Sequence, residues 1–190
     1  MTLIILISSL DQPSDLEEHR SKAQNAILSK HFPEAQIITI NCFGKNDETL
    51  TTDYFHRRAL AVMEDLQQFA EASFDEDMKE PVIFITRGTG GSLAKQILIM
   101  ALEDRRYYWL AFSTLALYFI DDFAYTKRDE KELSLFHLLY KVENPATSLP
   151  RVIMALSGTM TFIEAQFSAL FSAFHITYHI SKPNPTLESD

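Results

Sequence analysis

The chain has 190 residues, which is enough for one domain with a sizeable core. Its formal net charge is −9, and Lys and Arg nowhere form a long cluster, so nucleic acid is not an expected partner. The single cysteine, Cys42, excludes an internal disulfide and a cysteine-based zinc site, and it favours a reducing compartment, the cytoplasm.

The first half of the chain alternates strand-like and helix-like segments. The apolar run at 2–8 has no basic region before it, which predicts a strand and not a secretory signal. An amphipathic stretch follows at 14–32, and a β-branched strand at 35–41. A helix is predicted over 50–73, because apolar residues recur there on one helical face. These are Tyr54, Leu60, Met63, Leu66 and Phe69.

The middle of the chain continues the alternation. A buried strand is predicted at 81–86, a helix at 91–104 and a strand at 114–121, followed by a charged, partly helical segment at 126–142. The longest uncharged run, 107–120, is shorter than the ~20 residues that a bilayer-spanning helix needs. We therefore expect no membrane span.

The last part of the chain predicts a strand at 150–158, a helix at 162–174 and a strand at 175–180. The residues after 182 contain two prolines and are expected to form a flexible tail, 183–190, behind a single domain, 1–182. Alternating helices and apolar strands predict an α/β fold, with a mostly parallel sheet of about six strands and helices on both faces.

Glycines concentrate in one turn. Only five occur in the chain, and three of them, Gly88, Gly90 and Gly91, lie between the strand at 81–86 and the helix at 91–104. Such clustering indicates backbone dihedrals that other residues avoid. A strand, a tight turn and a helix form the layout that exposes the nucleophile in α/β-hydrolases.

The sequence resembles the serine-esterase or lipase-like α/β-hydrolase domains of fungal proteins. The clearest segment is "EPVIFITRGTGGSLAKQIL" at 80–98, which is similar to the strand, serine-bearing turn and helix of that family. Further similarity occurs at 2–15, 28–47, 115–125 and 163–186, so the resemblance covers most of the chain in order. It implies a truncated α/β-hydrolase-like fold.

The resemblance also implies that the catalytic machinery is lost. The nucleophilic serine of the family falls on Gly88, and the histidine before it falls on Arg87. Ser8 and Ser9 occupy the place of the His-Gly pair of the oxyanion loop. The acidic and histidine members of the triad would lie beyond residue 190, so a serine-hydrolase mechanism is not expected.

Several polar residues are candidates for a ligand-binding crevice. In parallel α/β sheets, ligands bind at the carboxyl ends of the strands, where we expect Ser8, Ser9, Arg87, Gly88, Thr89 and Asp121. If the protein is an enzyme, Asp121, Asp122, Arg87 and Thr89 are the catalytic candidates. The alternatives are structural, namely a turn role for Thr89 and an ion pair between Arg87 and Asp121 or Asp122. No metal or cofactor is expected.

Two functions remain open at this point. The first is an inactive, hydrolase-like module that binds, scaffolds or regulates a partner. The second is a non-hydrolytic enzyme (an isomerase, cyclase or lyase) that acts on a small molecule with acid–base groups in the same crevice. Because an apolar edge strand invites pairing with another chain, we expect a protein partner or a homodimer to use the strand at 175–180 and the helix at 162–174.

Overall fold

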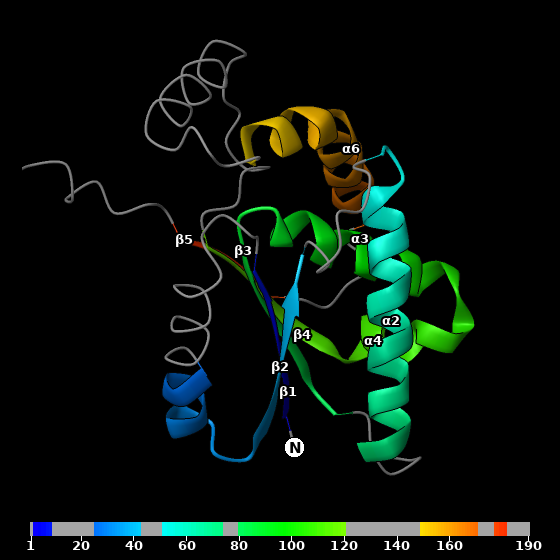
Figure 1. Cartoon of the computed structure of the whole chain (residues 1–190). Helices are drawn as coiled ribbons and strands as arrows, with labels where there is room; N and C mark the ends of the chain where they lie inside the picture. Colours follow the sequence, from blue (N-terminus) through cyan, green and yellow to red (C-terminus); the bar gives the residue numbers. More distant parts are fainter. Residues whose placement is uncertain are drawn as a thin grey trace, which may run out of the picture.

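The chain folds around one parallel β-sheet with helices packed against it (Figure 1). The computed structural model describes residues 2–8, 25–42, 51–73, 80–120, 149–170 and 177–181, and only the backbone of 149–157 and 177–181. The sheet contains β1 (Thr2–Ser8), β2 (Ala35–Asn41), β3 (Val82–Arg87), β4 (Thr114–Ile120) and β5 (Thr177–Ser181). The spatial order is β2-β1-β3-β4-β5, and every neighbouring pair is parallel. The predicted α/β class is therefore confirmed.

The predicted number of strands is wrong within the described part of the chain, where five strands form instead of about six. The segment 150–158, expected to be a strand, belongs to a helix, α6 (Leu149–Leu170). A short apolar run does not by itself distinguish a strand from a buried helix, and here the helical alternative is the one that forms. Pro150 fits it, since proline is tolerated in the first turn of a helix.

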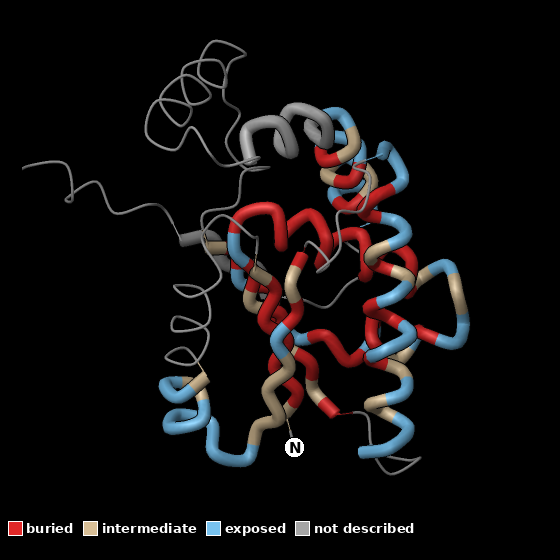
Figure 2. The backbone as a smooth tube through the Cα atoms, in the orientation of Figure 1, coloured by how far each residue is buried: buried red, intermediate tan, exposed pale blue. Residues whose placement is uncertain are grey.

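Helix α3 (Gly90–Glu103) is the centre of the helical layer. It packs against β1 and β3 on one side and against α2 (Tyr54–Ser73), α4 (Tyr108–Ser113) and α6 around it. Figure 2 shows α3 buried along most of its length, whereas α2 and α6 each keep an exposed stripe. A helix that is apolar nearly all round is stable only in such an interior position.

The opposite face of the sheet carries a shorter helical segment, residues 25–31, which lies across the sheet from α2 in Figure 1. It is the described part of the amphipathic stretch predicted at 14–32. Helices therefore lie on both faces, as expected for a parallel sheet, which must be covered on each side.

The main core lies between the sheet and α3. Along β1, Leu3, Ile5 and Ile7 belong to this core, as alternation of side chains along a strand requires. Met63 and Leu66 of the stripe predicted for α2 are fully buried. Leu60 and Phe69, also predicted, pack at its margin, and Tyr54 is buried with Met63 and Leu66.

The strand order defines where a ligand site belongs. The chain leaves β1 in one direction along the sheet to form β2, then crosses back over β1 to form β3. A crevice forms at such a reversal, outside the carboxyl ends of the two strands. In this protein these are the ends of β1 and β3. Within the segments that the structure describes, no helix is long and apolar enough to cross a membrane.

Candidate functional site

The turn after β3 takes the form that its glycines predict. Strand β3 ends at Arg87, and α3 begins at Gly90, so only Gly88 and Thr89 separate them. Gly88 has a φ of 54°, in the left-handed region that favours glycine. Its N–H donates to the carbonyl oxygen of Ile120 at 3.1 Å, which ties the turn to the end of β4. We call this turn the elbow. Its tip, Gly88, is buried and has no side chain.

Gly90 explains why the turn contains a second glycine. A Cβ atom at this position would lie 2.5 Å from the carbonyl oxygen of Ile7, closer than real Cβ contacts allow. The first turn of α3 therefore rests directly on the end of β1. This close approach joins the carboxyl end of β1 to the turn that follows β3.

The hydroxyl groups nearest the tip are enclosed by protein. The side chain of Thr89 is 0% exposed and that of Ser92 is 1% exposed. Neither hydroxyl oxygen has a hydrogen-bond partner among the described residues. The nearby thiol of Cys42, also buried, donates to the carbonyl oxygen of Thr89 at 3.7 Å and not to its hydroxyl. A nucleophile needs both access to a substrate and an adjacent base, and the described residues supply neither.

The structure brings four of the predicted site residues to one edge of the sheet. Since Ile7 pairs with Thr86, Ser8 and Arg87 are the next residues along the neighbouring strands β1 and β3. Ser8 is half-buried and Arg87 is exposed, while Gly88 and Thr89 are buried in the turn.

The other predicted site residues, Ser9, Asp121 and Asp122, lie outside the described residues. The enzyme hypothesis therefore depends on Asp121 and Asp122 for its acid–base groups. Among the described candidates, Arg87 carries a guanidinium group, which offers hydrogen-bond donors and no acceptor. The described edge offers a cation and a hydroxyl, which suit binding better than proton transfer.

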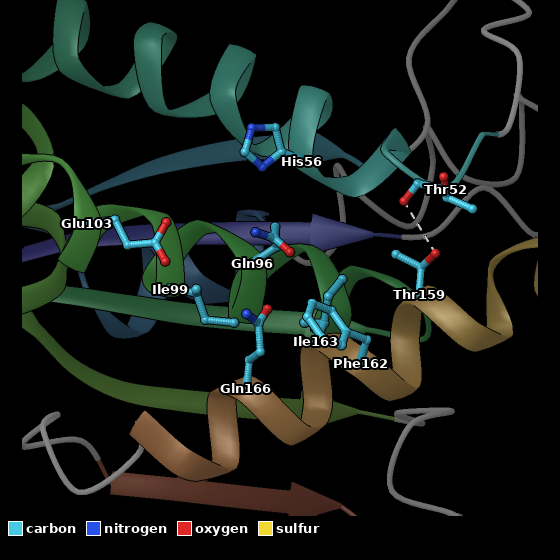
Figure 3. A pocket seen from close by; sticks show the side chains of 9 residues that line it. All are labelled: Thr52, His56, Gln96, Ile99, Glu103, Thr159, Phe162, Ile163 and Gln166. Carbon is cyan, nitrogen blue, oxygen red and sulfur yellow. Dashed lines mark hydrogen bonds between the residues drawn. The ribbon is translucent and has the colours of Figure 1, made fainter.

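A second candidate site lies between helices on one side of the sheet. Nine side chains line a pocket of about 240 Å³, and they come from Thr52, from the first turn of α2, from α3 and from α6 (Figure 3). Its floor is apolar, because Ile99 and Ile163 are buried there. Its polar residues include His56, Gln96 and Glu103. Sequence analysis missed this site, since its members are far apart in the sequence and match no motif.

The two ends of the pocket differ in the partners of their carboxylates. At the Thr52 end, Asp53 forms an ion pair with Arg57 at 2.9 Å. A hydrogen bond from Thr51, followed in effect by the charge of Arg57, lowers the pKa of Asp53 below its ordinary value. Glu103 stands at the opposite end, where Figure 3 shows its carboxylate turned toward Gln96. No lysine or arginine lines the pocket.

No protein-family profile matches the sequence, and no curated protein sequence matches it either. The resemblance to α/β-hydrolase-like domains of fungal proteins therefore remains a prediction. The turn at Gly88 and the pocket between the helices are the two features of the structure that bear on function.

Proposed function

We propose that the protein is a catalytically inactive, α/β-hydrolase-like module that acts by binding, scaffolding or regulating a partner. The observation that carries this proposal is Gly88, which occupies the tip of the elbow with a φ of 54°. A strand, a tight turn and a helix persist at this point, but the residue that would be the nucleophile has no side chain. The backbone of a hydrolase elbow is kept without its chemistry.

The burial of the neighbouring hydroxyls supports the same proposal. For Thr89 or Ser92 to replace a lost serine, its hydroxyl would have to reach a substrate carbonyl. Both are enclosed, and the hydroxyl of each faces no described hydrogen-bond acceptor that could serve as a base. To expose either hydroxyl, the first turn of α3 would have to move, and its packing on β1 would be lost.

The partner is proposed to be another protein or a second copy of the chain. Strand β5 ends the described sheet, and α6 leaves Phe162 and Leu170 exposed. An edge strand beside exposed apolar side chains is a surface that another chain can cover. The cytoplasm is the proposed location, because the single cysteine is a buried free thiol.

Covalent labelling with a fluorophosphonate probe tests the proposal, together with hydrolysis of a nitrophenyl ester. We expect no label on the protein and no ester cleavage above the solvent rate, while an active serine hydrolase in the same mixture is labelled fully. Stoichiometric labelling that disappears in the Thr89→Val variant would show a displaced nucleophile and would overturn the proposal.

A further inference from the structure

We infer that the pocket between α2, α3 and α6 binds a small organic cation, of the guanidinium or alkylammonium class. This site is separate from the elbow, and the inference holds whether or not the elbow is inert. It rests on the size of the pocket, on the signs of the charges around it and on the chemistry of its lining.

The volume of the pocket sets the size of the ligand. At about 240 Å³, it is smaller than the roughly 300–1,000 Å³ of sites for drug-sized molecules. It lies between α2, α3 and α6 (Figure 3). A ligand of a few heavy atoms, or one long side chain of a partner protein, matches this space.

The sign of the charge follows from the residues at the Glu103 end. Glu103 is the last residue of α3, so its carboxylate adds to the negative end of the helix dipole. The nearby Arg106 is bound to Asp104 at 2.6 Å, and its charge is therefore compensated there. No lysine or arginine lines the pocket, so an anion would find no permanent positive charge there, whereas a cation meets the carboxylate of Glu103.

The remaining lining suits the other parts of such a ligand. The amides of Gln96 and Gln166 flank the space beside Glu103 in Figure 3, and their oxygens can accept from N–H groups. Phe162 is 62% exposed and offers an apolar ring to the hydrocarbon part of the ligand. Buried Ile163 provides an apolar surface for a short hydrocarbon chain.

The overall charge of the protein favours the same class of ligand. A net charge of −9 raises the local concentration of cations around the whole molecule. Because Glu103 is exposed, solvent screens its attraction, and the binding should be weak and sensitive to salt.

A titration with n-propylguanidinium tests the inference. Its nearly isosteric neutral control is n-propylurea, and ionic strength is held constant. We expect the side-chain amide signals of Gln96 and Gln166 to shift and saturate in 1H–15N spectra with the cation. The urea should bind about 1.5- to fivefold more weakly, the range that an exposed charge contact supports.

Matched variants locate the binding. Glu103→Gln and Phe162→Ala change exposed side chains and should fold normally, and each should weaken binding of the cation. Glu34→Gln removes an exposed charge on another surface and should leave binding unchanged. Equal affinity for the urea and the cation, or unchanged affinity in Glu103→Gln, would overturn the inference.

Two sources could supply the cation, and a further titration distinguishes them. Blocked arginine, N-acetyl-arginine N-methylamide, carries the same group on a peptide backbone. Binding comparable to that of propylguanidinium indicates an arginine of a partner protein, and binding of propylguanidinium alone indicates a free small molecule. The absence of binding by both compounds would contradict the inference. Labelling at the elbow, which tests the proposed function, is independent of all these results.

Discussion

Gly88 is the residue on which both the geometry of the turn and the proposed loss of hydrolase chemistry depend. Its φ of 54° is accessible to glycine without strain, whereas an alanine in the left-handed region costs about 1–2 kcal/mol. We predict that Gly88→Ala lowers the free energy of unfolding by about this amount, measured by urea denaturation. Gly88→Asn should cost less, since asparagine tolerates this region. A Gly88→Ala protein as stable as the wild type would contradict the geometry of the turn.

Gly90 and Gly158 form a matched pair, because both are helical glycines in opposite surroundings. At Gly90 a Cβ would meet the carbonyl oxygen of Ile7 at 2.5 Å, while at Gly158 it meets nothing within 4 Å. We predict that Gly90→Ala destabilises the protein by about 1–3 kcal/mol, as overpacking does. Gly158→Ala should stabilise it by up to about 1 kcal/mol, since alanine is the better helix former.

Thermal and urea unfolding of the two alanine variants, side by side, check this prediction. The opposite signs are the decisive feature, because any general effect of alanine would move both proteins in the same direction. If Gly90→Ala unfolds no more easily than Gly158→Ala, the close contact between α3 and β1 is incorrect.

The glycine turn could be predicted from the sequence, but the accessibility of its hydroxyls could not. Three glycines within four positions after an apolar run are a local signal, and local signals survive folding. Whether Thr89 is open to solvent depends on Cys42, which is distant in sequence, and on the packing of α3. The pocket could not be predicted from the sequence for the same reason, since Glu103 and Gln166 come to line it only through the packing of α3 and α6.

Helix α6 shows how far a single element could be predicted. The helix at 162–174 was expected, and α6 includes its residues up to Leu170. Its first half was predicted as a strand, because a short apolar run has no clear period. The strand at 175–180 was nearly correct, as β5 spans Thr177–Ser181. In α6, the local sequence pattern thus predicted a helix correctly only in the half that has a polar face.

A buried ion pair fastens α6 to α3. The ammonium group of Lys95 is 2.5 Å from a carboxylate oxygen of Glu164 and 4.6 Å from the centre of the Phe119 ring. The lysine side chain is 0% exposed, whereas that of Glu164 is 23% exposed. Water can therefore reach the carboxylate but not the ammonium. The ammonium of Lys95 therefore depends more on the carboxylate of Glu164 than the carboxylate depends on the ammonium.

We predict that Glu164→Gln destabilises the protein more than Lys95→Met does. The first change removes the carboxylate that pairs with the enclosed ammonium, and breaking one side of a buried pair costs on the order of 3 kcal/mol. The second replaces the lysine with an apolar chain of similar length and leaves a carboxylate that water can solvate. Urea denaturation of both variants measures the difference.

The double variant serves as the control for this pair. Lys95→Met combined with Glu164→Gln should be more stable than the sum of the single losses predicts, because the two sites interact. Additive losses, or a larger loss for Lys95→Met than for Glu164→Gln, would show that the ion pair does not hold the helices together.

At the scale of the whole molecule, the sheet formed by the described residues ends at β2 on one side and at β5 on the other. The α/β class and the parallel pairing were predictable, since apolar strands alternated with helices along the chain. The spatial order of the strands was not, because it depends on where each helix crosses the sheet. That order leaves β5 at an edge, where the sequence predicted contact with another chain.

We predict that the protein forms a homodimer through the β5 edge and α6, detected as a concentration-dependent mass in sedimentation velocity. Leu170→Glu places a charge on the exposed face of α6 and should raise the dissociation constant about tenfold or more. Ile27→Glu changes an equally apolar, exposed side chain on the other face of the sheet and should have no effect. A monomer at high micromolar concentration excludes the homodimer and leaves a different protein as the partner, because the exposed face of α6 would still be available to it.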